Sequence, residues 1–131
     1  MVCLDTSVLI ALLRNEDNAM RKLRIEAERG TRICTTPVNL CELYAGAYAS
    51  RDRVKELRRV RGLQEVVRVL EFQAEACKKY GELVNDPVLR ERPIGDFDLI
   101  IASISLSHGE SLATRNVEHF QRIPELTVER W

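Results

Sequence analysis

The stretch Val2-Cys3-Leu4-Asp5-Thr6-Ser7-Val8-Leu9-Ile10 decides the fold class. Its first three residues predict a short buried strand. The polar residues that follow turn the chain into an apolar helix over 8–13, with Ser7 as the expected N-cap. Asp5 would then stand at the carboxyl end of the strand. A strand that leads directly into a helix is typical of proteins that combine both element types in one sandwich.

The same alternation of strands and helices continues along the chain. We expect further strands over 32–36, 66–70, 111–114 and 126–129, the last at an edge of the sheet. Helices are predicted over 17–28, 37–49, 51–64, 72–85 and 98–109, with a helical turn over 116–120 and a loop over 86–95. Strands separated by such helices predict an α/β sandwich on a central, mainly parallel sheet. Functional sites in these sheets gather at the carboxyl ends of the strands.

Length and composition indicate one soluble globular domain over residues 1–131. The 20 Lys and Arg residues balance 20 Asp and Glu residues, which excludes a global field that would steer a polyanion. The longest strongly apolar run, 8–13, is far too short to span a membrane, and no basic segment precedes an apolar one at the N-terminus. We therefore expect a cytoplasmic protein with no membrane partner.

The cysteines and histidines are all single in the sequence. The cysteines lack the close spacing of structural zinc sites, so we interpret all four as small buried apolar residues: Cys3, Cys34, Cys41 and Cys77. His108 and His119 have no second His or Cys at ligand spacing. We interpret both as ordinary surface or helix-end histidines.

Three carboxylates in apolar surroundings, Asp5, Glu42 and Asp98, are the main functional signal. Ionised side chains are costly to bury, and no Lys or Arg lies within several residues of Asp5 or Glu42. A divalent cation would offset this cost, because Mg²⁺ and Mn²⁺ prefer carboxylate oxygens and keep waters that substrate phosphates displace. Such a cation lowers the pKa of a bound water, and phosphodiester hydrolysis then requires acids rather than a Ser or Cys nucleophile.

Each acid also has an ordinary structural interpretation. Asp96 and Asp98 stand at a helix start, where carboxylates cap free backbone N–H groups and complement the helix dipole. Asp5 could cap the turn after its strand. Glu42 is different, because no basic residue lies three or four positions away on its helix to pair with it. The combination of these acids, rather than any one of them, favours a metal site.

Four segments resemble the motifs of the PIN domain, and the full chain resembles the VapC-type toxins of bacterial and archaeal toxin–antitoxin pairs. The segments are 4–10, 39–43, 94–102 and 112–120. The resemblance implies a PIN-like α/β/α sandwich and an endoribonuclease that depends on Mg²⁺ or Mn²⁺. It also implies a homodimer, and inhibition by a cognate antitoxin protein that lays a peptide across the active site.

By motif position, Asp5, Glu42 and Asp98 match the catalytic acidic triad of the family. The resemblance makes Asp5 and Asp98 the direct metal ligands, with Glu42 and the extra carboxylate of Asp96 as further candidates. Asn116 takes the place of a fourth acid and brings no charge, so we expect one bound metal.

The remaining candidates would bind the RNA substrate. They are Thr6, Ser7, Thr114, Arg115 and Asn116. The three hydroxyl groups have turn and cap hydrogen bonding as an equal alternative. Arg115 is the candidate for a flanking phosphate, with a solvated surface Arg as its alternative. The Arg-rich segment over 51–61 could follow RNA or contact the antitoxin. We favour a solvated helix face, because Asp52 and Glu56 lie within it.

Two other functions remain open on the sequence. One is a catalytically weak or inactive PIN scaffold that acts through protein binding, which the neutral Asn116 keeps open. The other is a phosphoacceptor enzyme with Asp5 as nucleophile. Such enzymes need a second nearby acid or a partnering Lys, and Thr6 and Ser7 follow Asp5 instead.

Overall fold

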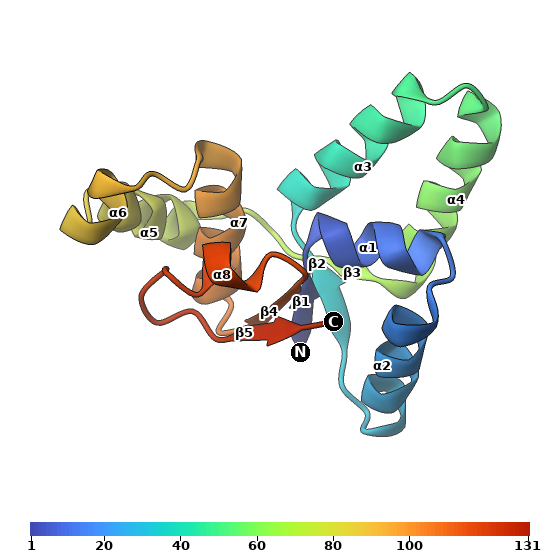
Figure 1. The fold of residues 1–131 in the computed structure, drawn as a ribbon, viewed down its shortest axis with the longest axis horizontal. Coiled ribbons are helices and arrows are strands. Elements are labelled where there is room, and N and C mark those ends of the chain that lie inside the picture. Colours follow the sequence, from blue (N-terminus) through green and yellow to red (C-terminus); the bar gives the residue numbers. More distant parts are fainter.

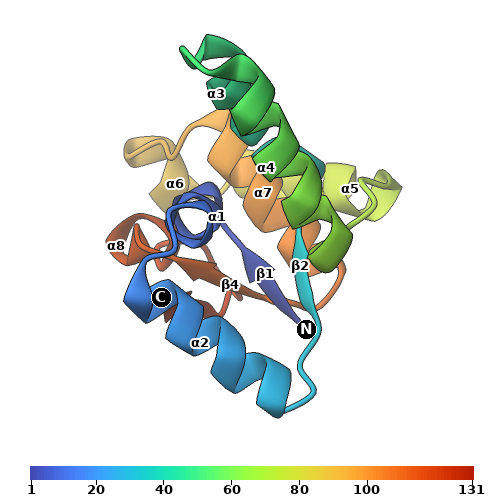
Figure 2. The same ribbon diagram turned by 90° about the vertical axis from the view of Figure 1, so that its right-hand side faces the viewer.

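The computed structural model describes residues 1–131 and contains one sheet of five parallel strands. The strands are β1 (Val2–Leu4), β2 (Ile33–Thr35), β3 (Arg68–Val69), β4 (Ser111–Thr114) and β5 (Val128–Arg130), in the spatial order β3-β2-β1-β4-β5. Figure 2 shows β1 between β2 and β4. The expected α/β sandwich is confirmed, and the sheet is entirely parallel.

Helices cover both faces of this sheet. They are α1 (Thr6–Leu13), α2 (Asp17–Glu28), α3 (Pro37–Ala49), α4 (Arg53–Val66), α5 (Ala74–Val84), α6 (Pro87–Glu91), α7 (Asp96–Ser107) and α8 (Val117–Phe120). Figure 1 shows α1 to α4 on one side of the sheet and α5 to α7 on the other. None of the helices combines the length and apolar character needed to cross a bilayer.

The alternation of side chains along β1 explains why two separate cores form. Val2 and Leu4 are buried against α1 to α4, whereas Cys3 faces the other way, into the core that contains α5 and α7. Successive residues of a strand point to opposite faces, so a strand buried on both faces is apolar throughout. Cys34, its register partner on β2, shares the Cys3 core. The prediction of buried cysteines is confirmed for these two and wrong for Cys41 and Cys77, which are exposed.

The ends of several elements differ from the predictions. Helix α1 begins two residues early, at Thr6, so Asp5 takes the N-cap position predicted for Ser7. Helix α7 likewise begins at Asp96 rather than Asp98, after Gly95, whose φ of 100° suits glycine. A short helix, α6, occupies part of the expected loop over 86–95. The side chain of Asp86 accepts hydrogen bonds from the first free N–H groups of this helix.

The predicted strand over 66–70 is wrong in its first half. Helix α4 continues to Val66, and the N–H of Val67 still donates to the carbonyl of Leu63. Only Arg68 and Val69 pair with β2. A β-branched run is compatible with either element, and here the end of the helix extends into it.

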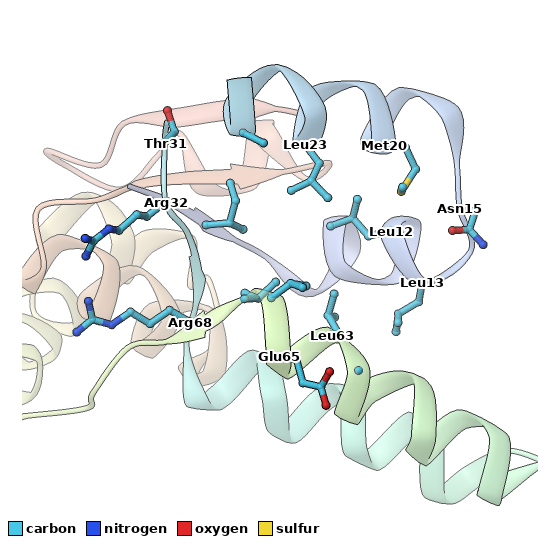
Figure 3. A pocket seen from close by; sticks show the side chains of 15 residues that line it. Leu12, Leu13, Asn15, Met20, Leu23, Thr31, Arg32, Leu63, Glu65 and Arg68 are labelled. Atoms are coloured by element: carbon cyan, nitrogen blue, oxygen red, sulfur yellow. The ribbon is translucent and has the colours of Figure 1, made fainter. Parts of the chain in front are cut away.

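An apolar groove of about 780 Å³ lies between α2 and α4, beside β2 and β3. Figure 3 shows Met20 and Leu23 of α2 on one side and Leu63 of α4 on the other. Arg32 and Arg68 also line the groove. None of the candidate catalytic acids lines it. The groove is therefore a surface feature separate from the acidic site.

Candidate active site

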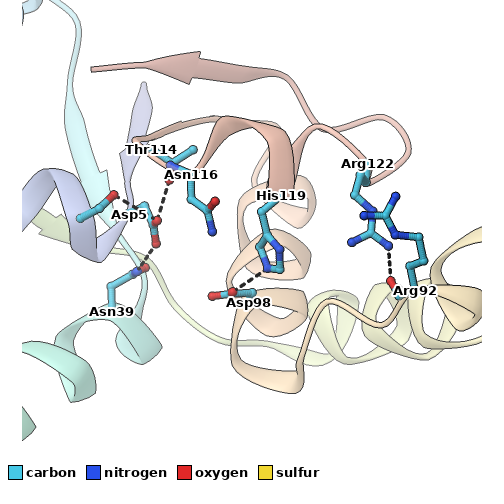
Figure 4. Close-up of polar contacts among 9 residues, drawn as sticks. Asp5, Asn39, Arg92, Asp98, Thr114, Asn116, His119 and Arg122 are labelled. Atoms are coloured by element: carbon cyan, nitrogen blue, oxygen red, sulfur yellow. Dashed lines mark hydrogen bonds and ion pairs between the residues drawn. The ribbon is translucent and has the colours of Figure 1, made fainter.

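Asp5 is the buried centre of the candidate site, with 7% of its surface exposed. It follows β1 in the middle of the sheet, at the carboxyl ends of the strands. Its Oδ1 accepts a hydrogen bond from Asn39 Nδ2 (3.1 Å), and its Oδ2 accepts one from Thr114 Oγ1 (2.7 Å) (Figure 4). Ser7 Oγ donates a longer bond to Oδ2 (3.4 Å). All three donors are neutral, so the structure holds an aspartate without a cationic partner.

Asn39 is a residue of this site that the sequence did not single out. It is fully buried on α3, and its Oδ1 accepts a hydrogen bond from Thr36 Oγ1 (2.7 Å) in the capping box that begins this helix. Its Nδ2 donates both to Asp5 and to Thr6 Oγ1 (2.9 Å). The spacing of Thr36 and Asn39 is a capping signal in the sequence, but it does not reveal the bond to Asp5.

Glu42 lies one helical turn after Asn39, so α3 presents both side chains toward α1. Its Oε1 accepts a hydrogen bond from Thr6 Oγ1 (2.9 Å). Burial raises the pKa of the Glu42 carboxyl, and the Thr6 hydroxyl opposes this shift. The negative charges of Asp5 and Asp98 raise the pKa of Glu42 further. The three predicted acids are therefore near enough to repel one another.

Asp98 lies in the first turn of α7 and is half-buried. Its Oδ2 is 2.9 Å from Nε2 of His119, as Figure 4 shows. Burial raises the pKa of Asp98, the hydrogen bond from His119 opposes the shift, and the charge of Asp5 adds to it. The interpretation of His119 as an ordinary helix-end residue missed this contact. His108, at the end of α7, instead lies 2.9 Å from the carbonyl oxygen of Glu71.

The predicted substrate-binding hydroxyls are all engaged inside the protein. Thr6 and Thr114 donate to Glu42 and Asp5, and Ser7 Oγ accepts a hydrogen bond from the N–H of Arg115 (3.1 Å). These three bonds join residues far apart in the sequence, so they are tertiary contacts rather than the local turn and cap bonds given as the alternative role.

The other candidates lie in different surroundings. The N–H of Asn116 donates to Thr114 Oγ1 (3.0 Å), and Figure 4 draws its side chain pointing into the space between Asp5 and Asp98. The Arg115 guanidinium forms an ion pair with Glu16 and donates to the Trp131 carbonyl oxygen (3.2 Å). Asp96 accepts a hydrogen bond from the hydroxyl of Tyr80 on α5 (2.9 Å), rather than contacting the other acids. Asp96 was a candidate metal ligand only because it lies two residues before Asp98 in the sequence.

The charges and the oxygen ligands of the three acids at the carboxyl ends of the strands fit a hard divalent cation. None of the ion pairs with Lys or Arg involves Asp5, Glu42 or Asp98. No three side chains of the types His, Cys, Asp and Glu converge at ligating distance. Mg²⁺ commonly takes only one or two carboxylates and completes its shell with water, so Asp5 and Asp98 suffice in number and chemistry.

The repulsion among the acids predicts a pH dependence of stability. A carboxyl whose pKa is higher in the folded than in the unfolded protein stabilises the fold when protonated, and this stabilisation is lost as the pH rises through the folded pKa. Since the pKa of Glu42 is raised, Glu42→Gln should raise the thermal midpoint at pH 7 by a few degrees, and the difference from wild type should shrink toward pH 4. Thermal unfolding without metal across this range measures it. A lower midpoint for the variant at every pH would show instead that the bond to Thr6 dominates.

Comparison with known proteins identifies the family of the chain. The PIN domain model matches residues 2–126. Over 128 residues, which are 98% of this chain and 96% of each relative, the chain is 33% identical to Ribonuclease VapC1 of Haemophilus influenzae (strain R2866). Over the same shares, it is 30% identical to the tRNA(fMet)-specific endonuclease VapC of Shigella flexneri.

Solved structures show the same similarity. VapBC2 from Rickettsia felis, bound to a DNA fragment from their promoter, matches with a TM-score of 0.92 and 26% identity, over 100% of this chain and 99% of that chain. VapBC-1 from nontypeable Haemophilus influenzae matches with a TM-score of 0.84 and 34% identity, over 100% and 98%. The chain therefore belongs to the PIN domain family, in which proteins named VapC ribonuclease are about 30% identical to it over its full length.

Proposed function

We propose that this chain is an endoribonuclease dependent on Mg²⁺ or Mn²⁺, and the toxin of a VapBC-type toxin–antitoxin system. The observation that carries the proposal is the group of acids at the carboxyl end of the sheet, where the charge of Asp5 raises the pKa of both Glu42 and Asp98 and no Lys or Arg pairs with any of the three. Full-length similarity to proteins named ribonuclease and tRNA(fMet)-specific endonuclease supports the reaction class. The RNA substrate implies action in the cytoplasm.

In this mechanism Asp5 and Asp98 would hold the cation. When bound, the cation would polarise the phosphoryl oxygen and lower the pKa of the attacking water. Glu42 orients this water and accepts its proton, for which a raised carboxyl pKa is suited. The Thr6 hydroxyl accepts a hydrogen bond from Asn39 and donates one to Glu42. Thr6 thereby restricts the position of the Glu42 carboxylate relative to Asp5, which Asn39 also contacts.

The substrate would be held around the acids by polar groups on β4, α1 and the turns beside them. We propose that the Asn116 amide donates to the scissile phosphate, since its side chain points into the space between the two metal ligands. The Thr6, Ser7 and Thr114 hydroxyls line the same edge. Arg115 binds a flanking phosphate after release from Glu16, because a phosphate competes with a carboxylate for the same guanidinium.

We propose two protein partners: an antitoxin and a second copy of this chain. Similar solved structures are VapBC complexes, which supports an antitoxin. The apolar groove between α2 and α4 offers a surface that a partner with an apolar face would cover. A homodimer, as the family resemblance implies, would cover exposed apolar side chains such as Tyr48, Val54 and Phe97.

The experiment that tests the function is cleavage of a mixed pool of structured RNAs by the purified protein. We expect cuts with Mg²⁺ or Mn²⁺ and none with a chelator, because the acids alone supply no electrophile for the phosphate. Calorimetry measures cation binding in parallel. If no metal supports cleavage and no cation binds, the alternative of an inactive PIN scaffold that acts through protein binding is favoured.

A further inference from the structure

We propose that His119 is a positioning residue, which fixes the Asp98 carboxylate so that one of its oxygens remains free for the cation. This inference rests on the proposed function. It concerns a side chain that neither motif spacing nor charge pattern brought to attention. The contact that carries it joins Nε2 of His119 to Oδ2 of Asp98 at 2.9 Å.

The chemistry of the pair defines its direction. An ionised carboxylate can only accept hydrogen bonds, so Nε2 of His119 carries the proton and donates it to Oδ2. Oδ1 of Asp98 accepts no hydrogen bond from the protein. One oxygen is thus held by the imidazole while the other faces away from it. Ligating carboxylates are commonly oriented by such outer hydrogen bonds.

The His119 ring is itself held by the core. It lies on α8, whose next residue, Phe120, is buried. The two rings meet edge to face, with centroids 5.4 Å apart and planes at 88°. The backbone N–H of His119 donates to the backbone carbonyl oxygen of Asn116 (3.2 Å). Backbone and core packing therefore both restrict where Nε2 points.

One short segment consequently orients both proposed metal ligands. Thr114, at the end of β4, donates to Asp5, and His119, five residues later, donates to Asp98. Asn116 lies between these two residues: its backbone N–H donates to Thr114 Oγ1 (3.0 Å), and its carbonyl oxygen accepts from the backbone N–H of His119. Glu118 is the only acid among residues 114–119, and it pairs with Arg130 on the surface. The segment therefore adds no negative charge to the site. The segment supplies hydrogen-bond donors where a fourth acid would otherwise stand.

A role in stability alone is a weaker explanation of the contact. Both side chains are partly exposed, 24% for His119 and 34% for Asp98, and partly exposed ion pairs stabilise a fold only slightly. Asp98 is also a group that the site would hold in one rotamer to bind a cation. The contact is thus better explained by orientation than by stability.

The test compares His119→Ala and His119→Gln with a matched control, His108→Ala. His108 makes a contact of equal length, 2.9 Å, to a backbone carbonyl oxygen outside the acidic site. Mn²⁺ affinity is measured by electron paramagnetic resonance, and RNA cleavage gives kcat and KM. We expect His119→Ala to weaken Mn²⁺ binding by about 10- to 100-fold and to lower kcat with the KM for RNA unchanged. His119→Gln should restore most of both, since its amide donates from nearly the position of Nε2, and His108→Ala should match wild type.

Metal-free measurements keep the test independent of catalysis and of folding. The ring ¹⁵N shifts of His119 should show the proton on Nε2, and Asp98→Asn should move them. Thermal unfolding identifies a variant that is not folded. If His119→Ala fails to fold, the ring shifts of His119 decide: a proton on Nε2 and a response to Asp98→Asn support the inference, and shifts that do not change in Asp98→Asn contradict it.

Two results would overturn the inference. One is wild-type Mn²⁺ affinity in His119→Ala, and the other is a Gln variant no better than the Ala variant. Asp98→Asn separates this failure from failure of the proposed function. If Asp98→Asn loses Mn²⁺ while His119→Ala keeps it, only the positioning role is wrong. If Asp98→Asn keeps full Mn²⁺ affinity, the metal site itself is wrong.

Discussion

Asp98→Asn is expected to abolish metal-dependent RNA cleavage, by at least about 1000-fold, or about 4 kcal/mol of transition-state stabilisation. The substitution removes one charged ligand of the proposed cation but keeps the shape of the side chain. Its amide oxygen can still accept the hydrogen bond from His119. The thermal midpoint without metal should stay the same or rise slightly, because burial and the Asp5 charge already disfavour an ionised carboxyl there.

Asp17→Asn is a matched control for this experiment. Asp17 is also an aspartate in the first turn of a helix, but it is exposed on α2 and away from the acidic edge. The Asp17→Asn variant should cleave RNA like the wild type. Retained cleavage by Asp98→Asn would contradict the proposed metal site. Loss of cooperative unfolding in that variant would instead show that Asp98 is structural.

Asn39→Asp is expected to have the largest effect on stability, lowering the free energy of unfolding at pH 7 by about 3–5 kcal/mol. Asn39 Nδ2 donates to both Asp5 Oδ1 and Thr6 Oγ1, and an ionised carboxylate can only accept. The substitution thus places two buried carboxylates side by side. Cleavage should also be lost, because Asp5 loses a donor that orients it.

The pH dependence of this variant distinguishes charge repulsion from simple loss of contacts. Burial and Asp5 raise the folded-state pKa of the introduced carboxyl, so protonation stabilises the fold, and this stabilisation is lost as the pH rises. Urea unfolding should show stability recovering from pH 8 to pH 5, relative to wild type. Asn39→Ala lacks the charge and should show an offset independent of pH. Equal pH profiles for the two variants would rule out the repulsion.

The fold could be predicted from the sequence because its strands carry strong local signals. Residues 2–4 and 111–114 are short runs at the correct spacing from helices, and parallel pairing of such strands places their carboxyl ends together. The sequence did not reveal that β1 and β4 are neighbours, which is what places Thr114 beside Asp5. The boundary of α4 was less predictable, because the β-branched residues 66–67 suit either a helix or a strand.

Two site residues could not be found in this way. Asn39 and His119 act through single hydrogen bonds to acids 34 and 21 residues away in sequence. Neither makes a repeated pattern, and an amide or an imidazole among apolar residues has many ordinary explanations. Tertiary packing decides their partners, since it sets the angle between α3, α7 and α8. The acids were detectable because burying charge has a cost that their neighbours in sequence do not offset.

The bond between Asp5 and Thr114 spans 109 residues and bears on how the protein is made. A ribosome delivers the N-terminal part of a chain first. Strand β1 therefore emerges with its β2 neighbour available, while β4, its other neighbour, and His119 are still to be synthesised. The proposed site is therefore complete only after β4 and α8 have emerged and packed beside β1 and α7. A partly synthesised chain that lacks residues 114–119 carries Asp5 and Glu42 without the hydrogen bonds by which Thr114 and His119 orient Asp5 and Asp98.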